Sequence, residues 1–150
     1  MKGIKVEPEV DIQIDLNVTS YIPDEYISDS NQKIEIYQNI ALCKNEEDIQ
    51  NVIDEIIDRF GNMPEELENL IDIARIKYLA KTQNISKIAS KKTAIVFTYE
   101  PNKFERNIEE MVKKYGNKIK FSAGIKPMVT LEIGTTNERQ ILNDTTEFLK

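Results

Sequence analysis

The run from Asn45 to Pro64 restricts the possible folds more than any other part of the sequence. Its apolar side chains recur every three or four residues, which predicts an amphipathic helix that buries one face. Asn45 is placed to cap the start of this helix, and the three acidic residues after it suit the positive end of the helix dipole. Gly61 is placed for a left-handed C-cap, and Pro64 suits the first turn of a following helix. The apolar face consists of Ile49, Val52, Ile53, Ile56 and Phe60.

A second face of the same helix carries Asn51, Glu55 and Asp58, which are neighbours at helical spacing. Glu55 and Asp58 lie in the last turn, near the negative end of the helix dipole, where carboxylates destabilise a helix. This placement is explained if the face binds a cationic protein partner, and also if Arg59 and nearby lysines screen the charges on an ordinary surface. Arg59 itself is interpreted as structural, because it can return to the last carbonyls or pair with an acid within the fold.

The remaining hydrophobic patterns predict an α+β fold, with a mixed sheet of about five strands, an N-terminal three-helix segment and two further helices. At 150 residues the chain has the length of a single domain. Residues 1–9 are interpreted as a flexible or linker-derived N-terminus. The strands are expected over 10–16, 85–89, 93–99, 119–121 and 128–133, and the helices over 30–43, 45–60, 64–82, 103–115 and 137–150.

The sequence lacks the residues that most enzymes use at neutral pH. It has no histidine and one cysteine, which removes the usual general base and a cysteine pair for zinc. It also contains no glycine-rich phosphate loop. A pair of carboxylates could still form a hydrolase site, but no motif indicates one. We therefore expect no catalytic, cofactor-binding or metal-binding residues. The lone Cys43 is interpreted as a small structural side chain, since no basic neighbour would lower its pKa.

Nothing in the sequence predicts contact with a membrane. No run approaches the roughly 18 apolar residues that a spanning helix needs, and no secretory signal peptide opens the chain. A single cysteine cannot form an internal disulfide, so the composition is compatible with the reducing cytoplasm.

Charge is distributed unevenly along the chain. From Glu7 to Asp72 there are 18 acidic and three basic residues, whereas six basic residues and no acidic ones lie between Asp72 and Glu100. The basic segment 75–92 leaves open an alternative function as a nucleic-acid-binding module. The net charge of −6 opposes strong phosphate binding, so we expect no direct nucleic-acid partner. The acidic half is better suited to an arginine-rich protein surface.

Four short motifs resemble one known family. The chain reads Ile-Ile-Asp-Arg-Phe-Gly-x-x-Pro over 56–64, Leu-Ile-Asp-Ile-Ala-Arg over 70–75, Tyr-Ile-Pro-Asp over 21–24 and Lys-Ile-Glu-Ile-Tyr over 33–37. Together they resemble the C-terminal domain of the bacterial transcription-repair coupling factors, the Mfd family. The similarity covers about residues 10–150 and weakens to a pattern after 91. The structural part of the motif is Arg59, Phe60, Gly61 and Pro64.

The resemblance implies a non-catalytic regulatory domain of a larger multidomain protein. Proteins of this family are ATP-dependent DNA translocases that displace stalled RNA polymerase and recruit UvrA, but none of their motor motifs occur in this chain. The resemblance implies that the domain docks on the UvrB-like module of its own parent and masks the surface that binds UvrA. Glu55 and Asp58 match the carboxylates of that contact, with Asn51 beside them. The resemblance therefore favours partner binding over screening on an ordinary surface.

Overall fold

The computed structural model describes residues 12–150, and its elements follow the predicted order of a strand, three helices, two strands, a helix, two strands and a helix. The α+β class with a mixed five-stranded sheet is confirmed. In chain order the elements are β1 (Gln13–Asp15), α1 (Ser30–Ala41), α2 (Glu46–Phe60), α3 (Glu65–Thr82), β2 (Ile85–Lys91), β3 (Ala94–Tyr99), α4 (Ile108–Tyr115), the short 3₁₀ turn η1 (Gly116–Lys118), β4 (Ile119–Ser122), β5 (Met128–Glu132) and α5 (Glu138–Leu149).

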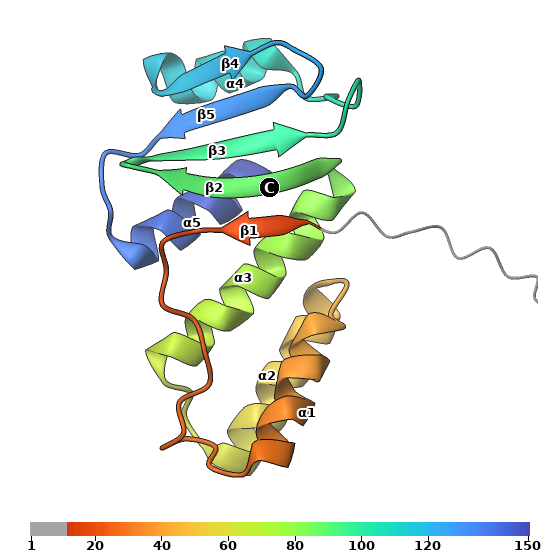
Figure 1. Ribbon diagram of the computed structural model, residues 1–150, viewed down its shortest axis with the longest axis vertical. Coiled ribbons are helices and arrows are strands. Elements are labelled where there is room, and N and C mark those ends of the chain that lie inside the picture. The colour runs from red at the N-terminus through yellow and green to blue at the C-terminus, as the bar shows by residue number, and fades with distance from the viewer. Residues whose placement is uncertain (1–11) are drawn as a thin grey trace, which may run out of the picture.

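The strands form one sheet in the order β1-β2-β3-β5-β4, in which only the β1–β2 pair is parallel. A tight turn joins β2 to β3, where Lys91 pairs with Ala94. Lys92 in this turn has a positive φ of 55°. The turn therefore lies at 92–93, and β2 is two residues longer than expected. Helices α3, α4 and α5 lie on one side of the sheet, with α4 next to β4 (Figure 1).

Two hydrophobic cores divide the molecule into halves that share α3. The sheet half packs α3, α4 and α5 against the strands, with Ile76 and Ala80 contributed by α3. The helical half packs α1, α2 and the loop before α1 against the N-terminal part of α3, through Leu67 and Ile71. Figure 1 shows α3 running from one half into the other, with α1 and α2 at the end far from β4.

The predicted bounds are wrong at one helix and differ slightly elsewhere. The helix expected over 103–115 begins at Ile108, because the Asn107 side chain caps it by accepting from the Glu110 N–H at 3.2 Å. Residues 101–102 form a turn in which Asn102 has φ 60°, and residues 103–107 have no helical structure. At the N-terminus, the expected strand 10–16 is confirmed over Gln13–Asp15. Its first two residues and the expected linker 1–9 lie outside the described residues.

No helix within residues 12–150 combines the length and the apolar character that crossing a membrane requires.

Candidate protein-binding face on helix α2

Helix α2 is defined at both ends by local hydrogen bonds. At its start the Asn45 side chain accepts from the Asp48 N–H at 2.8 Å. At its end the Gly61 N–H donates to the Ile57 carbonyl at 2.9 Å. Gly61 has φ 89° and ψ −163°, a region that is essentially restricted to glycine. It therefore has the positive φ expected of the C-cap, although ψ differs from that of a left-handed helix. The Tyr26 hydroxyl donates to the Gly61 carbonyl at 2.5 Å and holds the turn against the loop before α1.

The motif residues beside Gly61 all make contacts within the helical half. Arg59 pairs with Glu35 of α1 at 3.3 Å from Nη1 to Oε1, and its guanidinium lies 5.0 Å from the centre of the Phe60 ring. The half-buried Phe60 ring packs against Tyr26, with ring centres 5.9 Å apart. Pro64 stands at the N-cap position of α3, and its carbonyl accepts two of the first N–H groups of that helix. These residues fix the α2–α3 connection.

Asn51, Glu55 and Asp58 are exposed on α2 and fall within roughly 60° of arc at 100° per residue. The structure brings them onto one face but gives them different surroundings. The Asn39 Nδ2 of α1 donates to the Glu55 Oε2 at 3.5 Å, and the Arg59 Nη1 lies 4.0 Å from the same oxygen. Within residues 12–150, the side chains of Asn51 and Asp58 have no hydrogen-bond or ion-pair partner. Of the two carboxylates, Asp58 is thus the one with no charge partner within residues 12–150.

Two further carboxylates lie on the same face and were missed from the sequence. Glu47 and Asp54 fall within about 60° of Asn51 at 100° per residue, and both are exposed. The sequence places Glu47 in the favourable first turn, and its helical angle is the signal that could have placed it on this face as well. We call Glu47, Asn51, Asp54, Glu55 and Asp58 the acidic face. The nearest cation on α2, Arg59, is turned towards α1.

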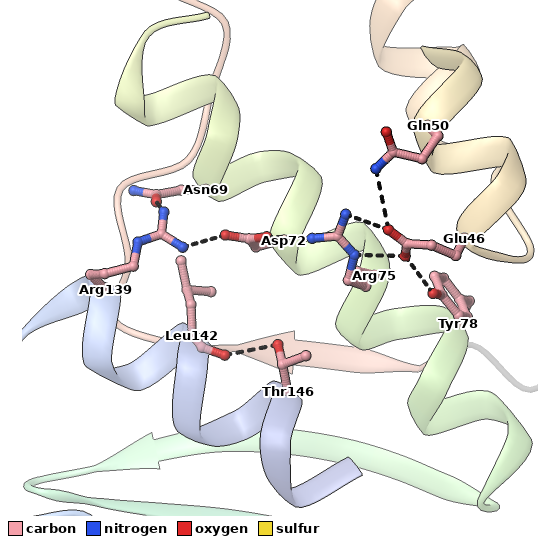
Figure 2. A network of polar contacts seen from close by, with 9 residues as sticks. All are labelled: Glu46, Gln50, Asn69, Asp72, Arg75, Tyr78, Arg139, Leu142 and Thr146. Carbon is pink, nitrogen blue, oxygen red and sulfur yellow. Dashed lines mark hydrogen bonds and ion pairs between the residues drawn. The ribbon is translucent and has the colours of Figure 1, made fainter. Parts of the chain in front are cut away.

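An ion network that the sequence did not predict holds α2 in its orientation (Figure 2). Glu46 of α2 accepts two hydrogen bonds from Arg75 of α3, each 2.8 Å long. Arg75 also donates to Asp72 at 2.8 Å, and the other carboxylate oxygen of Asp72 pairs with Arg139 of α5. Arg139 donates to the buried Asn69 at 2.6 Å. We call these five residues the ion network, and they connect α2, α3 and α5.

The ion network changes the protonation of the groups beside it. The hydrogen bonds from Arg75 lower the pKa of Glu46 to about 2. The Tyr78 hydroxyl donates to the same carboxylate at 2.8 Å, and burial together with this carboxylate raises the pKa of Tyr78 to about 12. Glu46 is therefore ionised and Tyr78 protonated throughout the physiological range. The local sequence predicts only a role in the helix dipole for Glu46, since its partners are 29 and 32 residues away.

The basic segment 75–92 does not form a free cationic strip. Arg75 is paired with two carboxylates, and the remaining basic residues are divided between α3, β2 and the turn after β2. Two nearby aromatic rings, Phe97 and Tyr99, are completely buried in the sheet half and cannot stack on bases. These placements weaken the nucleic-acid alternative.

Within 12–150 no group of three or more His, Cys, Asp or Glu side chains could hold a metal ion. Burial raises the pKa of the Cys43 thiol, with a further contribution from Asp48, so the reactive thiolate is disfavoured. The acidic face of α2 is chemically suited to binding the cationic side chains of a protein partner.

The comparisons with known proteins agree on one family. A family model, the TRCF domain, matches residues 16–111. The transcription-repair-coupling factor of Rickettsia typhi is 38% identical over 115 residues, which is 76% of this chain and 10% of that protein. That of Staphylococcus epidermidis is 39% identical over 116 residues, with 75% of this chain and 10% of that protein covered. The chain thus spans about a tenth of the length of these relatives.

A solved structure is similar over nearly the whole chain. The crystal structure of the C-terminal domain of a transcription-repair coupling factor superposes with a TM-score of 0.73, covering 93% of this chain and 94% of that one. The sequence identity is 22%, so this likeness shows the fold. Together with the family model and the relatives of Rickettsia and Staphylococcus, it shows that the chain belongs to the TRCF domain family.

Proposed function

We propose that this chain is the regulatory C-terminal domain of a transcription-repair coupling factor, and that the acidic face of α2 docks on the UvrB-like module of the same protein. The observation that carries the proposal is Asp58, an exposed carboxylate in the last turn of α2 with no partner in residues 12–150. A carboxylate at this end opposes the helix dipole. A cationic surface on another module would compensate that cost.

The chemistry of the face specifies arginine as the partner. Arginine binds carboxylates through a planar pair of N–H donors, and such charge-assisted contacts are stronger than neutral hydrogen bonds. Losing one partner of a buried interfacial pair costs about 2–5 kcal/mol, whereas a pair on a wet rim contributes about 0–1 kcal/mol. Glu55 is partly satisfied by Asn39 and Arg59, so Asp58 is expected to contribute more to docking than Glu55.

Docking would keep the parent protein in a masked state. The domain would cover the surface that UvrA binds, and release of the domain would expose it, so the domain acts on UvrA and RNA polymerase only indirectly. In this proposal the domain is non-catalytic, uses no cofactor and works in the bacterial cytoplasm. The ATP-dependent translocation belongs to other parts of the parent.

The test measures binding of this chain to the separately purified UvrB-like module by isothermal titration calorimetry at two salt concentrations. Asp58→Ala should weaken binding more than Glu55→Ala, and the double variant should weaken it most. A matched control is Glu105→Ala with Glu109→Ala, which removes the same charge from exposed sites near the opposite end of the molecule. Equal affinity of the wild type and the Glu55, Asp58 double variant, with both folded by circular dichroism, would overturn the proposal.

A second measurement follows the consequence in the full-length protein. The double variant should bind UvrA more tightly than the wild type, because a masked state that loses contacts is less populated. If docking were weakened but UvrA affinity were unchanged, the result would support the contact and contradict the masking of the UvrA surface.

A further inference from the structure

An apolar pocket is lined by residues of β4, β5 and the start of α4. In Figure 1, β4 lies at the end of the molecule opposite α1 and α2. The volume of the pocket is about 210 Å³, enough for one large side chain. Several apolar side chains around it are open to solvent: Ile108 is 49% exposed, Phe121 37% and Met128 38%. At the tip of the adjoining turn, Ile125 is 85% exposed. A cluster of large apolar side chains at one surface is typical of an interaction site. The pocket is lined chiefly by Phe104, Ile108, Phe121, Pro127, Met128 and Val129.

The backbone next to this pocket is also open to a partner. β4 is the last strand of the sheet and pairs only with β5 among the described residues. An outermost strand presents a row of backbone N–H and C=O groups to which another extended chain can pair. Peptides that bind in this way gain affinity from the backbone and specificity from pockets for their side chains. The edge of β4 and the adjacent pocket together fit that mode of binding.

The positive charge near β4 indicates which kind of polypeptide segment would bind here. Between Glu110 and Glu132 the sequence contains five lysines and no acidic residue, in a protein of net charge −6. Lys114 is paired with Glu147. In the described part of the chain, the exposed Lys113, Lys118 and Lys126 have no ion-pair partner. Lys118 and Lys126 precede and follow β4 in the chain, and Lys113 lies on α4. An acidic segment with an apolar anchor is therefore complementary to the β4 edge and the pocket.

We propose that the β4 edge and its pocket bind an extended acidic segment of another polypeptide, which pairs along β4 and inserts one large apolar side chain into the pocket. The acidic residues on either side of that anchor face Lys113, Lys118 and Lys126. This surface and the acidic face of α2 lie at opposite ends of the molecule. We therefore expect the two binding events to be independent of each other.

Two other occupants fit the surface less well. A single-stranded nucleic acid needs aromatic faces for its bases, but Phe104 packs edge-to-face against Tyr99 at 4.8 Å and against Phe121 at 6.3 Å. A second copy of this chain could offer its acidic face, but that face is helical and cannot pair with a strand edge. An extended acidic peptide satisfies the lysines, the pocket and the strand edge together.

The experiment selects a library of random ten-residue peptides on the immobilised wild-type chain at physiological salt. The enriched peptides should carry at least two acidic residues around one aromatic or large aliphatic residue. The best of them, made synthetically, should shift the amide resonances of β4 and the 123–127 turn in the ¹⁵N spectrum and leave those of α1 and α2 unchanged. Enrichment of peptides without acidic residues, or shifts confined to other elements, would overturn the proposal.

Three sets of changes test the lysines, the pocket and the β4 edge separately. Lys118→Glu with Lys126→Glu should weaken the selected peptide roughly tenfold or more, whereas the control Lys77→Glu with Lys87→Glu, at exposed sites on α3 and β2, should leave affinity within about twofold. Ile108→Ser tests the pocket at a half-exposed site and should also weaken binding. A probe with alternate backbone amides N-methylated should fail to bind, because its side chains remain but strand pairing is blocked.

The remaining occupants give distinct outcomes. Competition by a 20-nucleotide single strand of DNA at physiological salt would assign the surface to nucleic acid and overturn the proposal. Self-association in sedimentation equilibrium that Ile108→Ser abolishes would assign it to a second copy. Equal binding of the N-methylated and unmodified probes would reject pairing along β4.

Discussion

The helical half and the sheet half of this molecule are held together in different ways. The sheet half buries the aromatic rings of Phe97, Tyr99 and Phe148 completely beneath strands that hydrogen-bond to one another. The helical half completely buries only isoleucine and leucine, and its rings Tyr26 and Phe60 lie at the margin of the core. Because the hydrogen bonds of a helix are internal to it, packing and the ion network hold α1 and α2 to the rest. The comparison predicts that the helical half opens at lower free energy.

The halves also differ in the partners that their surfaces suit. The helical half presents the acidic face of α2, and the sheet half presents lysines around the β4 edge. Helix α3 is the element common to both cores, so it fixes the relative position of two surfaces of opposite charge. We therefore expect changes within one half to leave binding at the other end intact as long as α3 remains folded.

The largest expected effect comes from a ring in the sheet half. Phe97 is fully buried and stacks on Phe148 with ring centres 4.2 Å apart, so Phe97→Ala should cost about 3–5 kcal/mol of unfolding free energy. Phe60→Ala removes a half-buried ring and should cost about 1–2 kcal/mol, since less area returns to water. Equilibrium urea unfolding measures both. Equal losses of unfolding free energy would show that the two rings contribute equally to stability and would contradict the difference between the two halves.

The sequence predicts local features of this fold better than contacts between distant elements. The capped helix α2 and the order of elements follow from periodicity, caps and turn residues, all read within a few positions. The predicted start of α4 was wrong because the pattern looks helical from residue 103, whereas the Asn107 side chain caps the helix and makes it begin at Ile108. The Phe60 side chain belongs to the apolar stripe, yet its partial burial depends on the position of Tyr26.

The candidate site shows the same limit. The shared face of Asn51, Glu55 and Asp58 follows from helical spacing alone. Whether each side chain is free depends on α1, whose Asn39 is 16 residues from Glu55. Arg139 and Asp72 are 67 residues apart and meet only because α5 packs on α3. Oppositely charged residues are common enough in this chain that no local pattern could have selected that pair.

The next largest effect should come from the centre of the ion network. Asp72 is 19% exposed and lies between Arg75 and Arg139. Asp72→Asn leaves two cations facing each other without a shared carboxylate, which should cost about 1–3 kcal/mol, between the values for exposed and buried pairs. Hydrogen exchange should accelerate more in α1 and α2 than in β3. The control is Asp144→Asn on α5, outside the ion network, and a uniform acceleration throughout the molecule would contradict the weaker attachment of the helical half.

The same attachment should depend on pH through Glu46. Its folded pKa of about 2 lies below the ordinary value of 4.5, so its contribution to stability is fully present above about pH 4.5 and is lost as pH falls towards 2. Its side chain is half exposed, and solvent screening reduces the contribution to about 0.5–1 kcal/mol. Urea unfolding of the wild type and Glu46→Gln should differ by that amount at pH 6 and converge as pH falls towards 2. A constant difference would mean that the charge of Glu46 does not hold α2 to α3.

The smallest effects are expected on the acidic face, where their sign is more informative than their size. Asp58→Ala should raise the unfolding free energy by about 0.3–0.5 kcal/mol, because it removes a charge that opposes the helix dipole and has no partner in the described fold. Glu55→Ala should be near neutral, because relief of the dipole is offset by loss of the contacts to Asn39 and Arg59.

Glu47→Ala provides the matched control for this sign, since it removes the same kind of charge from the same face at the other end of α2. Glu47 lies in the first turn, where its carboxylate favours the helix, so its loss should lower the unfolding free energy by a similar amount. Thermal and urea unfolding of the three single variants at low ionic strength resolve the pattern, and added salt should reduce all three differences. If Asp58→Ala instead destabilised the chain as Glu47→Ala does, the Asp58 charge would be used within the fold. The position of Asp58 would then no longer indicate binding to a cationic partner.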